Sequence, residues 1–260
     1  MKPDLAVPGL RVLVTAGAGG IGRAIATTFA DAGAKVHICD VDRNALASIA
    51  AERPDITATY ADVSNLADVD RLFDDVRSRL GGLDVLVNNA GIAGPTGRIE
   101  DIKVEDWERC IAVDLNSLFY CTRLAMPMIK AAGGGSIISL SSAAGRLGFP
   151  LRSPYAAAKW GVVGFTASLA IEAGQDGVRV NCIQPGVVAG DRIDRVAAAK
   201  AEAFGVTTEE MKQRMVEKVS MRTMVSAQDI ANMALFLASD AGRHISGQAL
   251  SVCGNVETLA

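Results

Sequence analysis

The chain of 260 residues has no marked excess of either charge, no long hydrophobic run and few aromatic side chains. Its 26 Lys and Arg are interspersed with 29 Asp and Glu, which leaves a formal net charge of -3. Nucleic acids and anionic membranes attract proteins with a basic stripe, and this sequence has none, so we expect neither as a principal partner. Long uncharged stretches such as 131–145 and 160–171 are shorter than the ~18 residues that a transmembrane helix requires, so no such helix is predicted.

Cysteine is also scarce, and it follows no ligand or disulfide pattern. The five cysteines are an odd number and contain no C-x-x-C pair, which favours reduced core thiols over disulfides or metal ligands. We therefore expect no metal site. The N-terminus lacks a charged segment followed by an apolar one, so no secretion signal is predicted and the expected compartment is the cytoplasm.

Half of the residues are hydrophobic, and short β-branched runs alternate with longer helical patterns. The expected strands are 11–15, 35–40, 56–62, 85–88, 136–141, 179–185 and 249–254. The expected helices are 20–32, 44–51, 65–80, 104–131, 154–174 and 227–239. Because the strands are almost continuously apolar, we predict a doubly wound α/β fold, with a parallel sheet of seven strands and helices on both faces. One domain is expected over residues 1–260, with 190–221 placed as a substrate lid.

The first expected strand runs directly into a glycine-rich turn. Glycines in such a turn allow a pyrophosphate to approach the amides at a helix N-terminus. The residues expected to line the cofactor here are Gly17, Gly19, Gly20 and Ile21. A tight turn without a ligand is the alternative.

Asp40 ends the second expected strand, twenty positions after Gly20. This is the spacing of a carboxylate that accepts hydrogen bonds from an adenosine ribose. A carboxylate there repels a 2′-phosphate, and no Lys or Arg lies inside the glycine turn, so NAD is favoured over NADP. The alternative for Asp40 is a helix cap shared with Asp42.

Polar residues also follow the third and fourth expected strands, at the edge where open α/β sheets bind ligands. Asp62 and Val63 follow the third, and the run Asn88-Asn89-Ala90-Gly91 follows the fourth. We predict cofactor contacts from Asp62, Val63, Asn89, Ala90 and Gly91. Alternatively, Asp62 caps the next helix and the two asparagines merely form a turn.

The most informative pattern is Tyr155-Ala156-Ala157-Ala158-Lys159, preceded by Ser141 and Ser142 at the end of the fifth expected strand. Tyr and Lys at positions i and i+4 share one face of a helix. A tyrosine hydroxyl is a poor general base at neutral pH, but an adjacent ammonium and a cationic nicotinamide both favour the phenolate. The pattern therefore indicates a tyrosine that transfers protons.

At this point the sequence resembles the short-chain dehydrogenase/reductase family, in its single-domain branch, over residues 10–254. The motifs that carry the resemblance are Gly17-x-x-Gly20-x-Gly22, Asn88-Asn89-Ala90-Gly91, Ser142, Tyr155-x-x-x-Lys159 and Pro185-Gly186. The resemblance implies a Rossmann-type fold in which Tyr155 is the catalytic acid/base, Lys159 holds the nicotinamide ribose and Ser142 orients the substrate oxygen. Ser141 is the alternative for that last role. The resemblance also implies that the nicotinamide carboxamide is lined by Pro185, Gly186, Val187 and Val188.

Three positions depart from the family pattern. Ala16 replaces the first glycine of the turn, and Gly190 replaces the threonine expected five residues after Pro185. The catalytic asparagine of the family corresponds to Asp114, although Asn116 lies two positions further on. We align Asp114 with that asparagine and expect it to belong to the catalytic set.

The resemblance implies interconversion of a secondary alcohol and a ketone by hydride transfer to or from NAD. We expect a small polyol, a sugar or a hydroxy acid as substrate, because Phe149, Leu151 and Arg152 should border a pocket of mixed apolar and cationic character. The lid region 190–221 carries six cations and six anions, which we expect to lie on solvated helix faces. The alternatives are a 3-oxoacyl thioester reductase of the same family and a non-catalytic protein that senses the dinucleotide.

The expected helix 154–174 is apolar on nearly every side. Such a helix needs cover on both sides, and the sheet supplies only one. We therefore predict a second subunit across a two-fold axis, which the resemblance extends to a homotetramer.

Overall fold

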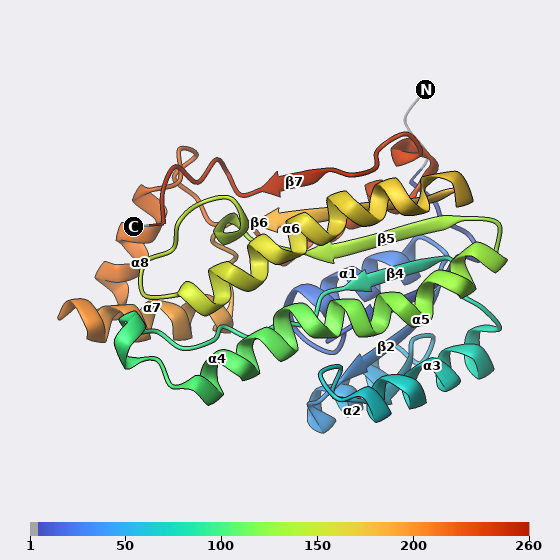
Figure 1. The fold of residues 1–260 in the computed structure, drawn as a ribbon, viewed down its shortest axis with the longest axis horizontal. Coiled ribbons are helices and arrows are strands. Elements are labelled where there is room, and N and C mark those ends of the chain that lie inside the picture. Colours follow the sequence, from blue (N-terminus) through green and yellow to red (C-terminus); the bar gives the residue numbers. More distant parts are fainter. Residues whose placement is uncertain (1–4, 260) are drawn as a thin grey trace.

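The computed structural model describes residues 5–259 and contains one parallel sheet of seven strands, in the order β3-β2-β1-β4-β5-β6-β7 (Figure 1). The strands are β1 (Arg11–Thr15), β2 (Lys35–Asp40), β3 (Thr57–Tyr60), β4 (Val85–Asn88), β5 (Gly135–Leu140), β6 (Val178–Pro185) and β7 (Ala249–Val252). The order reverses beside β1, because β2 and β4 flank it on opposite sides. Ligands of open α/β sheets bind at such a switch point, beyond the carboxyl ends of the strands.

Helices cover both faces of this sheet. They are α1 (Gly20–Asp31), α2 (Arg43–Glu52), α3 (Leu66–Leu80), α4 (Val104–Ile111), α5 (Ser117–Ala131), α6 (Ser153–Ala173), α7 (Asp191–Phe204), α8 (Thr208–Glu217) and α9 (Ala227–Ala238). One apolar core joins α1 and α9 to one face, and a second joins α3 and α5 to the other. The predicted doubly wound parallel sheet of seven strands is confirmed.

The predicted helix 104–131 is interrupted. A five-residue π-helical segment, Ala112–Asn116, separates α4 from α5. π-bulges of this kind occur frequently at functional sites. Asp114 lies in the middle of this segment and is 2% exposed.

The region 190–221 forms two helices, α7 and α8, beyond the carboxyl ends of β5 and β6 (Figure 1). Most of its charged side chains are exposed, but the expectation of solvated faces is wrong for Lys200, which is only 6% exposed. Packing of α7 against α8 and the C-terminal segment buries this side chain, a long-range effect that local charge counting does not capture.

No helix within residues 5–259 is both long and apolar enough to cross a membrane. In the same part of the chain, no group of three His, Cys, Asp or Glu side chains is arranged to hold a metal ion. The expectation of no secretion signal rests partly on residues 1–4, which lie outside the described residues.

Candidate active site

The glycines of the turn after β1 have two different surroundings. A Cβ on Gly17 would lie 2.6 Å from the side chain of Ile38, and one on Gly22 would lie 2.0 Å from the carbonyl oxygen of Ala16, so both are needed for packing. Gly19 and Gly20 have no atom within 4 Å of the equivalent position. Because α1 begins at Gly20 and no side chain caps it, its N-terminus is open to an anion.

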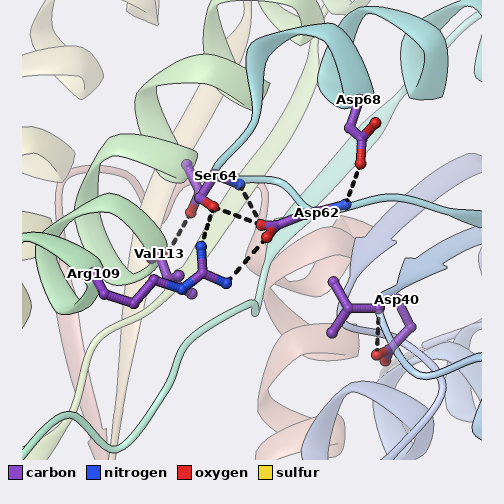
Figure 2. Close-up of polar contacts among 8 residues, drawn as sticks. Asp40, Asp62, Ser64, Asp68, Arg109 and Val113 are labelled. Carbon is purple, nitrogen blue, oxygen red and sulfur yellow. Dashed lines mark hydrogen bonds and ion pairs between the residues drawn. The ribbon is translucent and has the colours of Figure 1, made fainter. Parts of the chain in front are cut away.

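Asp40 lies at the end of β2, where backbone amides hold its carboxylate beside the glycine turn. Figure 2 shows the Asp40 side chain. Its Oδ2 accepts a hydrogen bond from the amide of Ala18 at 3.1 Å, and its Oδ1 accepts from the amides of Val41 and Asp42. Asp40 does not cap α2, since Asp42 alone accepts from the amides of Asn44 and Ala45. The Asp40 carboxylate is therefore fixed next to the glycine turn by three backbone amides.

Asp62 takes part in an ion pair that the sequence did not reveal. Figure 2 shows Arg109 reaching from α4 to Asp62 Oδ2, at 3.0 Å, and to the Ser64 hydroxyl, at 2.6 Å. Burial alone would raise the pKa of Asp62, but hydrogen bonds from Ser64 and Arg109 lower it below its ordinary value. Asp62 does not cap α3, because Asn65 does so. Its neighbour Val63 is buried.

Asn89, directly after β4, connects this strand to the end of β1. The side-chain amide of Asn89 donates to the carbonyl oxygens of Thr15 and Ala16, at 2.9 and 3.0 Å. The Thr15 hydroxyl accepts from the amides of Asn89 and Ala90. These bonds fix Ala90 and Gly91 next to the glycine turn, so the two motifs form one edge of the site.

Ser141 and Ser142 have different environments. Ser141 is buried, and its hydroxyl donates to the carbonyl oxygen of Lys159 at 2.8 Å, so it anchors α6. Ser142 is half-buried, and its hydroxyl accepts only the amide of Ala144 among the described bonds. Of the two serines, Ser142 therefore has a hydroxyl hydrogen available for a ligand.

Tyr155 and Lys159 lie on the first turns of α6. Lys159 is 3% exposed, and its Nζ lies 5.6 Å from the centroid of the Tyr155 ring. The same Nζ donates to the carbonyl oxygen of Leu140 at 3.0 Å. An ammonium group has three donors, so two remain for other partners.

Asp114 reaches this pair from the π-helical segment. Its Oδ1 accepts from the amide of Ile92 at 2.6 Å, and its Oδ2 lies 3.9 Å from the thiol of Cys110. A Cβ on Gly91 would stand 2.9 Å from Asp114 Oδ1 and 3.3 Å from Lys159 Nζ, so the two charged groups face the same glycine. Among the described contacts, Asp114 rather than Asn116 approaches Lys159.

The segment that follows β6, residues 186–190, borders the same end of the sheet. Gly186 donates its amide to Val252, and a Cβ on it would lie 2.7 Å from Cys253, so only glycine fits. Val188 pairs with Val225 in an isolated bridge, which holds the backbone extended from Pro185 towards α7. Gly190 follows with φ of 133° and supplies no side-chain donor.

Phe149 and Arg152 border Tyr155 at the start of α6. The ring of Phe149 packs edge-on against Tyr155, with the centroids 6.4 Å apart. The guanidinium of Arg152 lies 5.3 Å from the centroid of the Tyr155 ring. The predicted mixture of apolar and cationic character is therefore present beside the tyrosine.

Comparison with known proteins agrees with this geometry. A family model described as Enoyl-(Acyl carrier protein) reductase matches residues 16–255. A D-beta-hydroxybutyrate dehydrogenase of Rhizobium meliloti (strain 1021) is 34% identical over 249 residues, which cover 93% of this chain and 96% of the relative. A sorbitol dehydrogenase of Cereibacter sphaeroides is 36% identical over 248 residues, which cover 95% and 96%. The crystal structure of levodione reductase has a TM-score of 0.88 at 28% identity, covering 94% of this chain and 95% of that one.

Fold, site and relatives define a nicotinamide-dinucleotide-dependent oxidoreductase that acts on CH–OH groups. The chain belongs to the short-chain dehydrogenase/reductase family, and the reaction is the interconversion of a secondary alcohol and a ketone.

Proposed function

We propose that the protein is an NAD-dependent dehydrogenase of a small polyol, sugar or hydroxy acid, with Tyr155 as the acid/base. The observation that carries this proposal is the placement of Tyr155, Lys159 and Ser142 at the carboxyl edge of the sheet, across from a glycine turn that is flanked by Asp40. Relatives named hydroxybutyrate and sorbitol dehydrogenases support it.

The residues at this edge fit a dinucleotide. The open N-terminus of α1 at Gly19, Gly20 and Ile21 would hold the pyrophosphate, with Gly17 allowing the turn. Asp40 would accept hydrogen bonds from the adenosine ribose. The expected linings of the adenine and the nicotinamide are Asp62, Val63, Asn89, Ala90, Gly91, Pro185, Gly186 and Val188. The cofactor, when bound, supplies the hydride acceptor or donor at C4 of its nicotinamide.

The chain's own residues move the proton and position the substrate. In oxidation, the phenolate of Tyr155 takes the hydroxyl proton of the alcohol, and in reduction the phenol returns it to the carbonyl oxygen. Ser142 donates to the same oxygen and fixes its direction. The two free donors of Lys159 serve the Tyr155 oxygen and the nicotinamide ribose.

We assign Asp114 to a positioning role. Its bond to the amide of Ile92 fixes the segment after Gly91, and its carboxylate and the Lys159 ammonium face the same glycine.

The remaining parts of the proposal concern the lid, the assembly and the compartment. We assign α7 and α8, within residues 190–221, to a substrate lid on one domain that spans the chain. The exposed large apolar side chains Phe119, Trp160 and Ile171 on α5 and α6 support a homotetramer. The five cysteines are all buried and free, which supports the reducing cytoplasm as the compartment.

A second candidate is reduction of a 3-oxoacyl thioester, because a 3-oxoacyl-[acyl-carrier-protein] reductase of Staphylococcus aureus (strain Mu50 / ATCC 700699) is 34% identical over 249 residues. One panel separates the two. Polyols, sugars, hydroxy acids and 3-hydroxyacyl thioesters are offered with NAD or NADP at mildly alkaline pH, and formation of the reduced cofactor is followed by absorbance. We expect NADH from a non-thioester alcohol, whereas activity confined to thioesters would favour the reductase. Bound dinucleotide without turnover of any substrate would favour the sensor.

A further inference from the structure

Two cations are buried around Phe149, the ring that packs on Tyr155, and neither has an acidic partner at ion-pair distance among the described residues. Arg152 is 2% exposed and Lys200 is 6% exposed. Arg152 donates to the carbonyl oxygen of Ala93, while its buried Nε has no hydrogen-bond partner. Lys200 Nζ donates to the carbonyl oxygen of Leu259 at 3.2 Å. Within residues 5–259, neither cation has a carboxylate at ion-pair distance.

The two cations share one aromatic ring, which itself packs on the tyrosine. The Phe149 centroid lies 5.2 Å from the guanidinium carbon of Arg152 and 4.7 Å from Lys200 Nζ. Arg152 is also 5.3 Å from the Tyr155 ring centroid. Arg152 directly precedes α6, the helix that carries Tyr155, and Lys200 lies on α7 of the lid. The lid therefore adds a second positive charge next to Phe149.

A cavity of about 100 Å³ lies under the lid, where Phe149 and Lys200 form part of its wall. Its walls include Phe149, Val187, Lys200, Met211, Met215 and Lys218. Most of these wall residues are apolar, and the charged ones are cationic. The cavity therefore suits a short alkyl chain better than a sugar ring.

Burial makes the charged forms of both side chains energetically unfavourable when no ligand is bound. Burial lowers the pKa of Arg152, and burial, Lys218 and Arg152 together lower the pKa of Lys200 to about 8. The carboxylate of Asp114 opposes this lowering of the Arg152 pKa, but it already accepts a hydrogen bond from the amide of Ile92. A buried charge is normally retained only with a partner, so a ligand with a negative charge would complete this cluster.

We propose that Arg152 and Lys200 bind the carboxylate of a short hydroxy acid whose carbinol carbon faces Tyr155. This rests on the proposed function and selects one of its substrate classes. The planar guanidinium suits bidentate contact with a carboxylate, and Lys200 supplies a second charged donor. The alkyl remainder occupies the cavity under α7 and α8. Neutral polyols and acyl thioesters lack the free carboxylate and leave the two cations uncompensated.

The test compares matched acids and neutral alcohols with NAD in the wild type. The acids are the two enantiomers of 3-hydroxybutyrate and of 2-hydroxybutyrate, and the neutral probes are 2-butanol and methyl 3-hydroxybutyrate. A charged hydrogen bond contributes roughly 1.5–3 kcal/mol, which corresponds to about 10- to 100-fold in kcat/KM for each cation. We expect an acid to exceed its methyl ester by at least that factor. Equal or better oxidation of the neutral alcohols would overturn the proposal and leave the proposed function intact.

Variants test the two residues separately. Arg152→Gln and Lys200→Gln should each lower kcat/KM for the acid by about 10- to 100-fold, mainly through KM, with little effect on the ester. Arg195→Gln, which removes a charge from the exposed face of α7, is the matched control and should change neither substrate. If kcat/KM fell equally for the acid and the ester, the two cations would only support the fold and would not bind the carboxylate.

Two further readouts separate binding from structural support. Lys200→Gln removes an uncompensated buried charge, so its thermal midpoint should equal or exceed that of the wild type. In the wild type, KM for the acid should rise above pH 8 as Lys200 loses its proton, and this rise should be absent for 2-butanol and in Lys200→Gln. Direct titration of butyrate, an unreactive carboxylate, into the wild-type complex with NADH should show binding that Lys200→Gln weakens. That titration decides the proposal even if no alcohol is oxidised, and butyrate affinity unchanged by the substitution would overturn it.

Discussion

Replacing Asp40 by asparagine tests the preference for NAD. The substitution removes one negative charge at the end of β2 while keeping a side-chain oxygen of the same reach. Two unit charges about 4 Å apart repel by about 4 kcal/mol at an effective dielectric constant of 20, and by about 1 kcal/mol in bulk water. Because Asp40 is half-buried, we take about 2–3 kcal/mol for its repulsion of a 2′-phosphate, which is about 30- to 150-fold in kcat/KM.

The expected result is that the wild type prefers NAD by at least about 30-fold and that Asp40→Asn narrows this ratio to about tenfold or less. Asparagine has only one acceptor oxygen, so the amide of Ala18 or of Val41 loses its partner and both cofactors bind more weakly. The readout is therefore the ratio of kcat/KM for NAD to kcat/KM for NADP, and neither rate alone. Initial rates with NAD and NADP on one substrate provide it. Asp42→Asn is the control, because it makes the same charge change at a helix cap where asparagine is equally suitable. Comparable use of NADP by the wild type, or an unchanged ratio in Asp40→Asn, would refute the reasoning.

Three other predictions concern assembly, the proton path and stability. Light scattering at micromolar concentration should give a homotetramer, because Phe119 and Trp160 are each 51% exposed on helices that lack cover; a monomer would refute this. Asp114→Asn should stay active and reach its maximal rate of oxidation at a lower pH than the wild type, because a negative charge near Lys159 is removed; superimposable pH profiles would show that this charge is neutralised elsewhere. Burial and Arg79 lower the pKa of His37 from 6.5 to about 4, so the folded state keeps the ring neutral while the unfolded chain protonates it below pH 6.5. The stability that this provides is therefore complete above pH 6.5 and falls by about 3 kcal/mol towards pH 4, a loss that denaturant unfolding should not find in His37→Asn.

The sheet could be predicted from the sequence because its strands are short apolar runs with polar residues at their carboxyl ends. The bounds of β1, β2 and β4 agree with the expectation, and those of the other strands differ by one or two residues. Asp40 and the glycine turn were visible because both are local signals at a fixed spacing.

The contacts that distinguish this site were not visible in the sequence. Arg109 lies 47 residues from Asp62, and nothing local links them before α4 folds against the sheet. Ser141 and Ser142 are adjacent, so only the direction of each side chain at the end of β5 decides which one anchors Lys159. Lys200 belongs to a segment of balanced charge, and its burial follows from the packing of α7 on α8.

The central claim, that Tyr155 transfers the proton of a secondary alcohol while NAD takes the hydride, is tested most directly by Tyr155→Phe. Phenylalanine keeps the ring that packs on Phe149 and removes only the hydroxyl. NADH binding, followed by fluorescence titration, should be nearly unchanged, and kcat for the best alcohol of the panel should fall by about 100-fold or more. A Tyr155→Phe protein that binds NADH normally and turns over at a near-normal rate would contradict the account.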